Sequence, residues 1–414
     1  MKALVLAAGR SKRMQPVGDK NFLNFLGKPL IQHQMELLAR NGLTEIIVVG
    51  SCTNIEKIKE IGEKVDASVT VCEQVDLDLG MAGAVLAARH LVEGPVLIFS
   101  GNDVVEDAAV KMAMEAEGSC MIGKKVEHYF PGGYLETDEH GFIKNIVEKP
   151  GEGHEPSDMI NLVVHRHQDI AKLTEYLDRA KSENDDLYEV AISEMIEDGE
   201  MILALPYDGF WQPVKYPWHV HRVFEYFFAQ AEKRVSEKAE IAKSAVIRGE
   251  VIIEDGVKIF DGAVISGPVY IGKGSIVANN ALLRSSHIAE DCMVGFSTEV
   301  ARSYWGNKVW THMNYVGDSV IGEDVSFGAG AVTGNLRLDD GDVMVDGVDT
   351  KMQKVGAIIG DHVRVGINAS IMPGVKIGGN SFIGAGIVLA SDVPDGSFVR
   401  ASVELKISEN KFKK

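Results

Sequence analysis

The C-terminal half of the sequence repeats an aliphatic or aromatic residue every six positions, often with glycine next. The repeated residues are Ile241, Ile247, Ile253, Ile259, Ile265, Ile271, Val277 and Leu283, then Ile321 and Phe327, and finally Ile359, Val365, Ile371, Ile377, Ile383 and Leu389. This period is typical of a parallel β-helix, in which each unit supplies one short strand and one turn. Glycine at the next position tolerates turn dihedrals and close stacking of the coils. A β-sandwich would instead show alternation with period two.

The six-residue spacing is lost twice, at about 296–315 and at about 336–356. An insertion in a repeat protein maps to a loop on its surface, and such loops commonly carry function. We therefore expect two surface loops on the β-helix, with candidate functional residues inside them.

Residues 1–216 alternate apolar strand candidates with helix candidates, which predicts an α/β domain with a mostly parallel sheet. The predicted strands are Ala3–Leu6, Ile46–Val49, Val96–Phe99, Met159–Val164 and Met201–Leu205, and the predicted helices include Leu30–Asn41, Ala82–His90 and Asp169–Lys181. Apolar residues at helical spacing over His219–Lys233 follow Pro217 and predict a connecting helix packed on one domain. We expect a Rossmann-like α/β domain at 1–216, a connecting helix at 217–238 and a left-handed β-helix at 239–414.

Charge and composition argue against several classes of protein, including nucleic-acid-binding, membrane-spanning and disulfide-rich proteins. The 414 residues include 42 Lys and Arg against 60 Asp and Glu, a net charge of −18 that disfavours nucleic acid as a partner. No apolar run approaches the ~18 residues of a membrane span, and the N-terminus lacks the features of a signal peptide. The four cysteines form no C-x-x-C pair, which argues against a zinc site or a disulfide framework. We expect a cytoplasmic protein.

The first predicted strand runs into a small-residue turn with basic neighbours. Leu6, Ala8 and Gly9 begin this turn, and Arg13 and Lys20 follow it. Backbone N–H groups of such a turn can point at phosphate oxygens, and the two cations could neutralise charge on a triphosphate and on departing pyrophosphate. A solvated surface loop is the alternative.

The turn is part of the run Leu-Ala-Ala-Gly-x-x-x-Arg-Met, which is followed by Lys20 and by Gly-Lys-Pro-Leu at 27–30. This part of the sequence resembles the sugar-1-phosphate nucleotidylyltransferases. The match continues through 80–84, 101–103, 133–134, 148–150 and Asn161. The resemblance implies that a sugar 1-phosphate oxygen attacks the α-phosphorus of a nucleoside triphosphate, with Mg²⁺ held by carboxylates. It implies catalytic roles for Arg13 and Lys20, nucleotide binding by Leu6, Ala8, Gly9, Gln74 and Gly80, sugar-phosphate binding by Gly133, Glu148, Lys149 and Asn161, and Asp103 as the metal ligand.

Two features bear on the metal site. Asp103 could instead cap a helix at Val104–Glu115. Pro213 stands where many members of the family carry a second metal carboxylate, and proline cannot bind magnesium, although Asp208 lies nearby in the sequence.

The sequence also departs from the family pattern at Ser11, Lys12 and Met81. The nucleotide stays open, with UTP and dTTP as candidates.

The first interruption contains His312-x-x-Tyr315-x-Gly317-Asp318, and Asn335 closes a glycine-rich run that begins at Gly328. These segments resemble the acetyltransferase half of the bifunctional N-acetylglucosamine-1-phosphate uridylyltransferases, and nearly the whole chain is similar to their archaeal branch. An imidazole suits the general base that takes a proton from an attacking amine, so we expect His312 in that role, against the alternative of a surface or core histidine.

The same resemblance implies acetyl-CoA as the acyl donor, a homotrimer, and contacts from Tyr315 and Asn335 to the sugar phosphate or the acyl group. Only Arg302 could replace a sugar-phosphate lysine of the family, and Ala301 precedes it, so the acceptor could be glucosamine 1-phosphate, galactosamine 1-phosphate or another amino sugar. Trp305 and Trp310 could serve an interface or the sugar.

We therefore expect a bifunctional enzyme of nucleotide-sugar biosynthesis. Its partners would be a sugar 1-phosphate, a nucleoside triphosphate and acetyl-CoA, with no nucleic acid and no membrane. Two alternatives stay open. In one, a single half is active, either the acetyltransferase or a glucose-1-phosphate thymidylyltransferase-like half. In the other, the chain is a non-catalytic sugar-nucleotide-binding scaffold.

Overall fold

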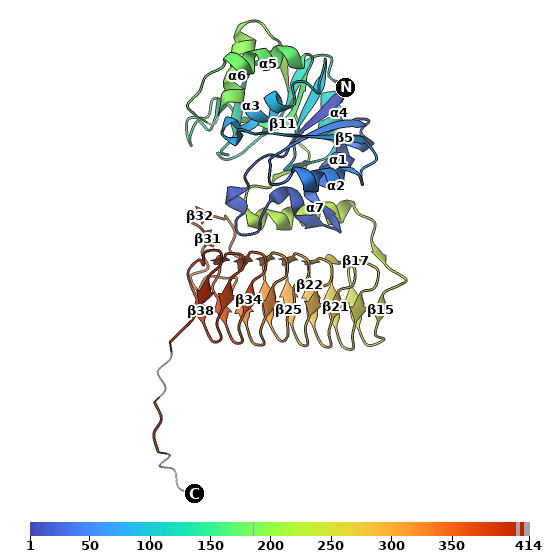
Figure 1. Ribbon diagram of the computed structural model, residues 1–414, viewed down its shortest axis with the longest axis vertical. Coiled ribbons are helices and arrows are strands. Elements are labelled where there is room, and N and C mark those ends of the chain that lie inside the picture. Colours follow the sequence, from blue (N-terminus) through green and yellow to red (C-terminus); the bar gives the residue numbers. More distant parts are fainter. Residues whose placement is uncertain (185, 403–405, 410–414) are drawn as a thin grey trace. The chain divides into compact units, whose positions relative to one another are not determined.

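The computed structural model describes residues 1–184, 186–402 and 406–409 and divides into two compact units (Figure 1). The first unit consists of residues 1–12, 19–23 and 28–215, and the second of residues 13–18, 24–27 and 216–414. Among the described residues, no helix is long and apolar enough to cross a membrane.

The first unit is built on a mixed nine-stranded sheet. The order along the sheet is β10 (Ile143–Glu148), β9 (Gly133–Thr137), β11 (Met159–His167), β6 (Val96–Ser100), β1 (Lys2–Leu6), β4 (Glu45–Gly50) and β5 (Ser68–Glu73), with β8 (Ser119–Lys125) paired to β11 and to β12 (Ile202–Pro206). The five predicted strands are confirmed as β1, β4, β6, β11 and β12. The expectation of a mostly parallel sheet holds only for β5-β4-β1-β6 and the β8–β12 pair, because β11 runs antiparallel to β6, β8 and β9.

Helices cover both faces of this sheet. Buried side chains of α1 (Leu30–Arg40), α2 (Ile55–Gly62) and α4 (Asp107–Glu115) share one hydrophobic core with the sheet. Those of α3 (Gly80–Ala87), α5 (Ile170–Arg179) and α6 (Leu187–Glu197) share a second core. The unit is therefore a three-layer α/β domain, an arrangement in which binding sites form at the carboxyl ends of parallel strands.

A two-stranded ribbon follows β6. Its strands are β7 (Asp103–Val105) and β13 (Trp211–Pro213), which pair antiparallel with Asp103 opposite Pro213. The alternative role of Asp103 as a helix cap is wrong, because α4 begins at Asp107 and its N-cap residue is Glu106. Asp103 instead starts a strand.

The second unit is a parallel β-helix with three sheets along its length. One sheet runs through β14 (Arg234–Val235), β17 (Val251–Ile253), β20 (Val269–Ile271), β23 (His287–Ile288), β26 (Tyr304–Trp305), β28 (Val320–Ile321), β33 (Ile358–Ile359) and β36 (Lys376–Ile377). The next runs through β16 (Val246–Arg248), β19 (Val264–Ser266), β22 (Leu282–Arg284), β25 (Glu299–Ala301), β27 (Tyr315–Gly317), β30 (Val332–Thr333), β35 (Ser370–Ile371) and β38 (Val388–Leu389).

The third side of the coil has two sheets. The first contains β15 (Glu240–Ile241), β18 (Lys258–Ile259), β21 (Ile276–Val277) and β24 (Met293–Val294), and the second contains β29 (Ser326–Phe327), β34 (Arg364–Val365), β37 (Phe382–Ile383) and β39 (Phe398–Val399). Trp310 bridges to Met293 on one side and to Ser326 on the other, so this side of the coil is continuous.

The first interruption of the six-residue spacing is not an inserted loop, and that expectation was wrong. Ile265 pairs with Leu283, Leu283 with Val300, and Val300 with Val316, so the coil that ends at Val300 is shorter than the one before it, and the coil that ends at Val316 is shorter again. The coils continue through 296–315, and their shortened corners shift the phase of the pattern.

The second interruption is a true insertion. Thr333 pairs with Ile371, and the residues between them exceed what a single coil of the β-helix needs. The hairpin formed by β31 (Met344–Val345) and β32 (Val348–Asp349) lies within this insertion. The expected surface loop is therefore confirmed here.

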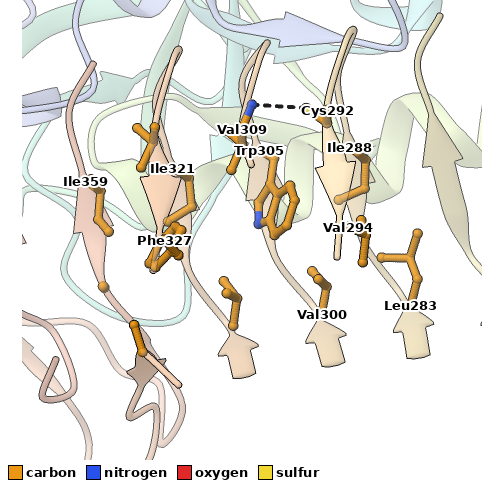
Figure 2. Close-up of a cluster of buried hydrophobic side chains, with 14 of the residues drawn as sticks. Leu283, Ile288, Cys292, Val294, Val300, Trp305, Val309, Ile321, Phe327 and Ile359 are labelled. Carbon is orange, nitrogen blue, oxygen red and sulfur yellow. Dashed lines mark hydrogen bonds between the residues drawn. The ribbon is translucent and has the colours of Figure 1, made fainter. Parts of the chain in front are cut away.

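The repeated aliphatic residues point into the coil and form one continuous core (Figure 2). Trp305 lies in this core and is fully buried, so the expectation that it serves an interface or a sugar is wrong. It fills the interior where the neighbouring coils carry Ile288 and Ile321. The Sγ atom of Cys292 accepts a hydrogen bond of 3.4 Å from the Val309 N–H. Trp310 is outside the coil and 55% exposed.

The glycines that follow the repeated residues are required by close stacking. A Cβ on Gly272 would lie 2.6 Å from the backbone of Ala289, and one on Gly328 would lie 2.6 Å from the backbone nitrogen of Ile367. Neither glycine has a positive φ. The absent side chain, rather than an unusual turn conformation, is what the next coil needs.

A helix does occur in the predicted connecting segment 217–238, but it is shorter than expected: α7 spans Val220–Gln230, and β14 already begins at Arg234. This helix belongs to the second unit. The ring of Phe224 lies 5.5 Å from that of His287 on β23. His287 stacks between Tyr270 and Tyr304 of the neighbouring coils, with centroid distances of 4.9 Å on both sides. Tyr270, His287 and Tyr304 thus form a row of stacked rings on one sheet of the β-helix. Segment 24–27 is held against this row, because the Tyr304 hydroxyl donates to the Asn24 carbonyl at 2.9 Å.

Candidate functional site

The loop after β1 is held by a partly buried hydrogen-bond network centred on Asp19. The carboxylate of Asp19 accepts hydrogen bonds from Asn21, from Nδ2 of Asn54 at 3.0 Å, and from the Ser11 hydroxyl at 3.3 Å. Asn21 and Asn54 also donate to the carbonyl oxygen of Ala7. Asp19 thus fixes the loop shape, and its only signal in the sequence was its position beside Lys20.

A cavity of about 250 Å³ lies where β1 and β6 end. All five residues predicted to bind a nucleotide line it: Leu6, Ala8, Gly9, Gln74 and Gly80. A Cβ on Gly9 would meet nothing within 4 Å, so the fold itself does not require this glycine. The missing side chain leaves the Gly9 backbone open to a ligand.

Gln74 has a fixed orientation at the cavity wall. Its Nε2 group donates to the carbonyl oxygens of Asp76 and Gly80, both at 2.9 Å. A Cβ on Gly83 would lie 2.6 Å from this nitrogen, so only glycine leaves room for the amide. Gly80 itself has a φ of +52°, which favours glycine as well. With both N–H donors used, Gln74 can offer a ligand only its Oε1 acceptor.

Three cations in and after the loop, Arg10, Lys20 and Arg13, lie in different surroundings. Arg10 lines the cavity and forms an ion pair of 2.6 Å with Asp78, and its guanidinium lowers the pKa of that carboxyl group. Lys20 belongs to the first unit, and its backbone N–H donates to the Ser11 hydroxyl at 3.3 Å. Arg13 is exposed and belongs to the second unit.

The four residues predicted to bind a sugar phosphate form one cluster. Gly133 of β9 pairs with Glu148 of β10, and a Cβ on Gly133 would lie 3.1 Å from the Glu148 carboxylate and 3.8 Å from Cβ of Asn161. Lys149 forms an ion pair of 2.9 Å with Glu148. Asn161 shares strand β11 with Val163, which lines the cavity and lies on the same face of the strand, so the cluster adjoins the cavity.

Asp103 offers one carboxylate for a metal ion. One of its oxygens accepts a hydrogen bond of 3.2 Å from the indole of Trp211, which leaves the other for a ligand. Pro213 lies directly opposite on β13, where a second carboxylate would face Asp103 across the ribbon. Asp208 is exposed, and no group of three or more potential metal ligands of the types His, Cys, Asp and Glu occurs within 1–184, 186–402 and 406–409. Mg²⁺ is commonly held by one or two carboxylates together with phosphate oxygens, so Asp103 fits such an ion.

A second cluster lies on the β-helix around Asp318. Arg302 donates to both of its carboxylate oxygens, at 2.6 and 2.7 Å, and Asn335 also donates to it. The Asn335 amide reaches the Tyr315 hydroxyl at 3.1 Å. The structure therefore brings Arg302, Tyr315 and Asn335 together, and Asp318, which sequence reasoning did not assign, joins two of them. Its signal was its place at the end of the His-x-x-Tyr-x-Gly-Asp run.

Several local features hold this cluster. Arg302 and Asp318 lie at corners of successive coils with φ values of +46° and +50°. A Cβ on Gly317 would lie 2.5 Å from the Tyr315 hydroxyl, so a side chain there would displace it. The Asp318 side chain is 9% exposed and that of Arg302 is 36% exposed, and the carboxylate raises the pKa of the guanidinium.

His312 is exposed on the turn that leads into β27. Its backbone is fixed, because its N–H donates to Asn314 Oδ1 at 2.7 Å and its carbonyl accepts from the Thr298 hydroxyl at 2.7 Å. A Cβ on Gly295 would lie 2.2 Å from that carbonyl, so the glycine allows this close turn. Tyr315 of the second cluster follows shortly after it, at the start of β27.

His221 of α7 adjoins the second cluster. Its Nε2 atom is buried without a hydrogen-bond partner among the described residues. Burial lowers the pKa of this imidazole to about 4, with Asp318 raising and Arg302 lowering it. The ring is therefore neutral at the edge of the Arg302–Asp318 pair.

Comparison with known families and proteins gives full-length matches. Residues 2–214 match the nucleotidyl transferase family, and residues 250–285 and 356–390 match bacterial transferase hexapeptide repeats. A bifunctional sugar-1-phosphate nucleotidylyltransferase/acetyltransferase of Sulfurisphaera tokodaii is 34% identical, with 97% of this chain and 100% of that protein covered. The bifunctional protein GlmU of Methanococcus vannielii is 32% identical, and that of Methanococcus maripaludis 33%, each covering 99% of this chain and 100% of the relative.

Proposed function

Because the chain belongs to the family of bifunctional sugar-1-phosphate nucleotidylyltransferase/acetyltransferase proteins, we propose that it acetylates an amino-sugar 1-phosphate and transfers a nucleotidyl group to a sugar 1-phosphate. Acetyl-CoA is the acyl donor, and UTP or dTTP is the nucleotide. The product is an activated N-acetylhexosamine, and we expect the enzyme to act in the cytoplasm. The observation that carries the nucleotidyl half is the cavity on which all five predicted nucleotide-binding residues converge.

The fixed amide of Gln74 supports a uracil or thymine base. Only its Oε1 acceptor is left for a ligand, since both N–H groups are bound to backbone carbonyls. Uracil and thymine carry an N3–H donor, whereas cytosine presents an acceptor at N3. An acceptor facing an acceptor leaves two polar groups unpaired, so the geometry favours UTP or dTTP over CTP.

In the nucleotidyl half, a phosphate oxygen of the sugar 1-phosphate attacks the α-phosphorus, and the bond to the β-phosphate breaks to release pyrophosphate. The open backbone at Ala8 and Gly9 binds the triphosphate, and Lys20 neutralises its charge. Glu148, Lys149 and Asn161 bind the sugar 1-phosphate. Asp103 holds Mg²⁺, which supplies charge neutralisation at the phosphates when bound.

In the acetyl half, His312 accepts the proton of the amine that attacks the thioester carbonyl, and CoA leaves as the thiol. An exposed imidazole can reach a substrate on the surface of the coil. Tyr315 and Asn335 orient the acceptor or the acyl group, and Arg302 is the cation available for the sugar phosphate. We also propose a homotrimer, since the outward row of the sheet from β16 to β38 is mostly apolar, with Val246 and Val388 exposed.

Two assays on the same preparation test this function. Release of pyrophosphate is measured with UTP, dTTP and CTP, each with N-acetylglucosamine 1-phosphate and N-acetylgalactosamine 1-phosphate. Release of the CoA thiol is measured with glucosamine 1-phosphate and galactosamine 1-phosphate. Both activities are expected in one preparation, and absence of either over its whole panel would contradict the bifunctional assignment.

The position of Pro213 opposite Asp103 favours one second candidate, an enzyme in which only the acetyl half is active. Its signature would be release of CoA without release of pyrophosphate from any pair of substrates.

A further inference from the structure

A chain of hydrogen bonds runs behind Asn161 in the first unit. His165 Nε2 lies 2.6 Å from Asn161 Oδ1, and His165 Nδ1 lies 2.9 Å from the hydroxyl oxygen of Tyr188. The same hydroxyl lies 2.9 Å from Nε2 of His167. Both imidazoles and the phenol are fully buried, and only Asn161 is partly exposed. We call the three buried side chains, His165, Tyr188 and His167, the relay.

The far end of the relay fixes where its protons lie. Burial lowers the pKa of His167 to about 4 and that of His165 well below its ordinary value, so each ring is neutral and carries one proton. Nδ1 of His167 is buried without a hydrogen-bond partner among the described residues. A buried N–H without an acceptor is rarer and more costly than an unused lone pair, so the proton of His167 lies on Nε2.

The remaining protons follow from that one. Nε2–H of His167 donates to the Tyr188 oxygen, so the Tyr188 hydroxyl must donate to Nδ1 of His165. The proton of His165 then lies on Nε2 and is donated to Oδ1 of Asn161. The opposite direction would require a buried, unsatisfied N–H at His167.

We propose that the relay fixes the side-chain amide of Asn161 so that it presents N–H donors, and no acceptor, to an acceptor oxygen of the sugar 1-phosphate. His165, Tyr188 and His167 are positioning residues in this account, since none of them reaches the cavity. The inference rests on the proposed nucleotidylyltransferase function and deepens it. Apolar side chains would fill the same space without burying three polar groups, and the relay has its exposed end at the sugar-phosphate cluster.

The tautomers test the relay without any turnover. Nitrogen-15 NMR of the histidine-labelled full chain distinguishes Nε2–H from Nδ1–H imidazoles, and the signals are assigned by His165→Gln and His167→Gln. The relay predicts Nε2–H on both rings. An Nδ1–H form of His165 would reverse the amide of Asn161 and overturn the inference.

Steady-state kinetics test whether the relay affects binding of the sugar 1-phosphate. Tyr188→Phe keeps the ring but removes the hydroxyl, so the amide of Asn161 loses its fixed direction. We expect the KM for the sugar 1-phosphate to rise about tenfold, as for one lost hydrogen bond, while the KM for the nucleotide and kcat stay within about twofold. Tyr176→Phe is the control, because Tyr176 packs in the same core but its hydroxyl donates to the exposed carboxylate of Asp198 at 2.8 Å and takes no part in the hydrogen bonds to Asn161.

An unchanged sugar KM in Tyr188→Phe, or an equal rise in Tyr176→Phe, would overturn the proposed relay. Wild-type protein that shows the predicted tautomers but no turnover with any sugar 1-phosphate would refute the proposed function, and with it the sugar-binding role. Wild-type protein that turns over but carries the reversed tautomer would overturn the relay alone.

Discussion

Replacement of Asp318 by asparagine removes the charge that holds the second cluster together. The carboxylate accepts two hydrogen bonds from Arg302, at 2.6 and 2.7 Å, and one from Asn335, and its side chain is 9% exposed. An amide of the same shape offers one acceptor oxygen and turns an N–H₂ group toward these donors. Breaking a buried ion pair costs about 3–5 kcal/mol, and Arg302 is a third exposed, so we expect a loss of about 2–3 kcal/mol in unfolding free energy.

Acetyl transfer should fall further than stability alone explains. Without the carboxylate, Arg302 and the amide of Asn335 lose their fixed positions, and a misplacement of about 1 Å commonly costs about 100-fold in rate. We expect a drop of that size in kcat/KM for release of CoA from acetyl-CoA, measured at a temperature where the variant is folded. Release of pyrophosphate should stay within about twofold of the wild type.

Asp324→Asn is the matched control. Asp324 also accepts two hydrogen bonds from one arginine, Arg364, at 2.9 and 3.0 Å, but it is 38% exposed. Exposed pairs contribute less than about 1 kcal/mol, so this variant should keep its stability and both activities nearly unchanged. Acetyl transfer by Asp318→Asn within about twofold of the wild type would refute the role assigned to the cluster, as would an equal loss in Asp324→Asn.

Three further outcomes follow from the structure. His312→Ala should abolish release of CoA and leave release of pyrophosphate within about twofold, and a parallel loss of both activities would contradict independent sites. Gly83→Ala adds a Cβ 2.6 Å from Nε2 of Gln74, so we expect the KM for UTP to rise about tenfold with the sugar KM unchanged, and an unchanged UTP KM would show that Gln74 does not contact the base. Chelation with EDTA should stop release of pyrophosphate and spare acetyl transfer, whereas pyrophosphate release that survives chelation would argue against a metal at Asp103.

Periodicity alone was enough to predict the β-helix, because every coil needs an apolar residue pointing inward and glycine where the next coil approaches closely. It could not reveal that the coils ending at Val300 and Val316 are shorter than those before them. A shortened corner and an inserted loop disturb the phase of a repeat in the same way, and only the pairing of strands distinguishes them. For the same reason Trp305 was a candidate for an interface or for the sugar, although it lies in the core.

Motifs predicted the groups of residues that the structure brings together at the cavity and at Asp318, but they did not reveal what holds those groups. Asp19, the backbone contacts of Gln74 and the relay behind Asn161 are hydrogen bonds between segments without a shared pattern. A sequence shows which polar residues exist, and the fold decides which of them become partners. Asp103 illustrates this, because its assignment as a strand residue depends on pairing with β13, which lies far along the chain.

The central claim is that the first unit is an active nucleotidylyltransferase in spite of Pro213. The most direct measurement is Mg²⁺-dependent release of pyrophosphate from UTP and dTTP, each with N-acetylglucosamine 1-phosphate, N-acetylgalactosamine 1-phosphate and glucose 1-phosphate. We expect release with at least one N-acetylhexosamine 1-phosphate. No release with any of the six pairs would contradict the claim and leave a β-helix acetyltransferase joined to a domain that only binds sugar nucleotides.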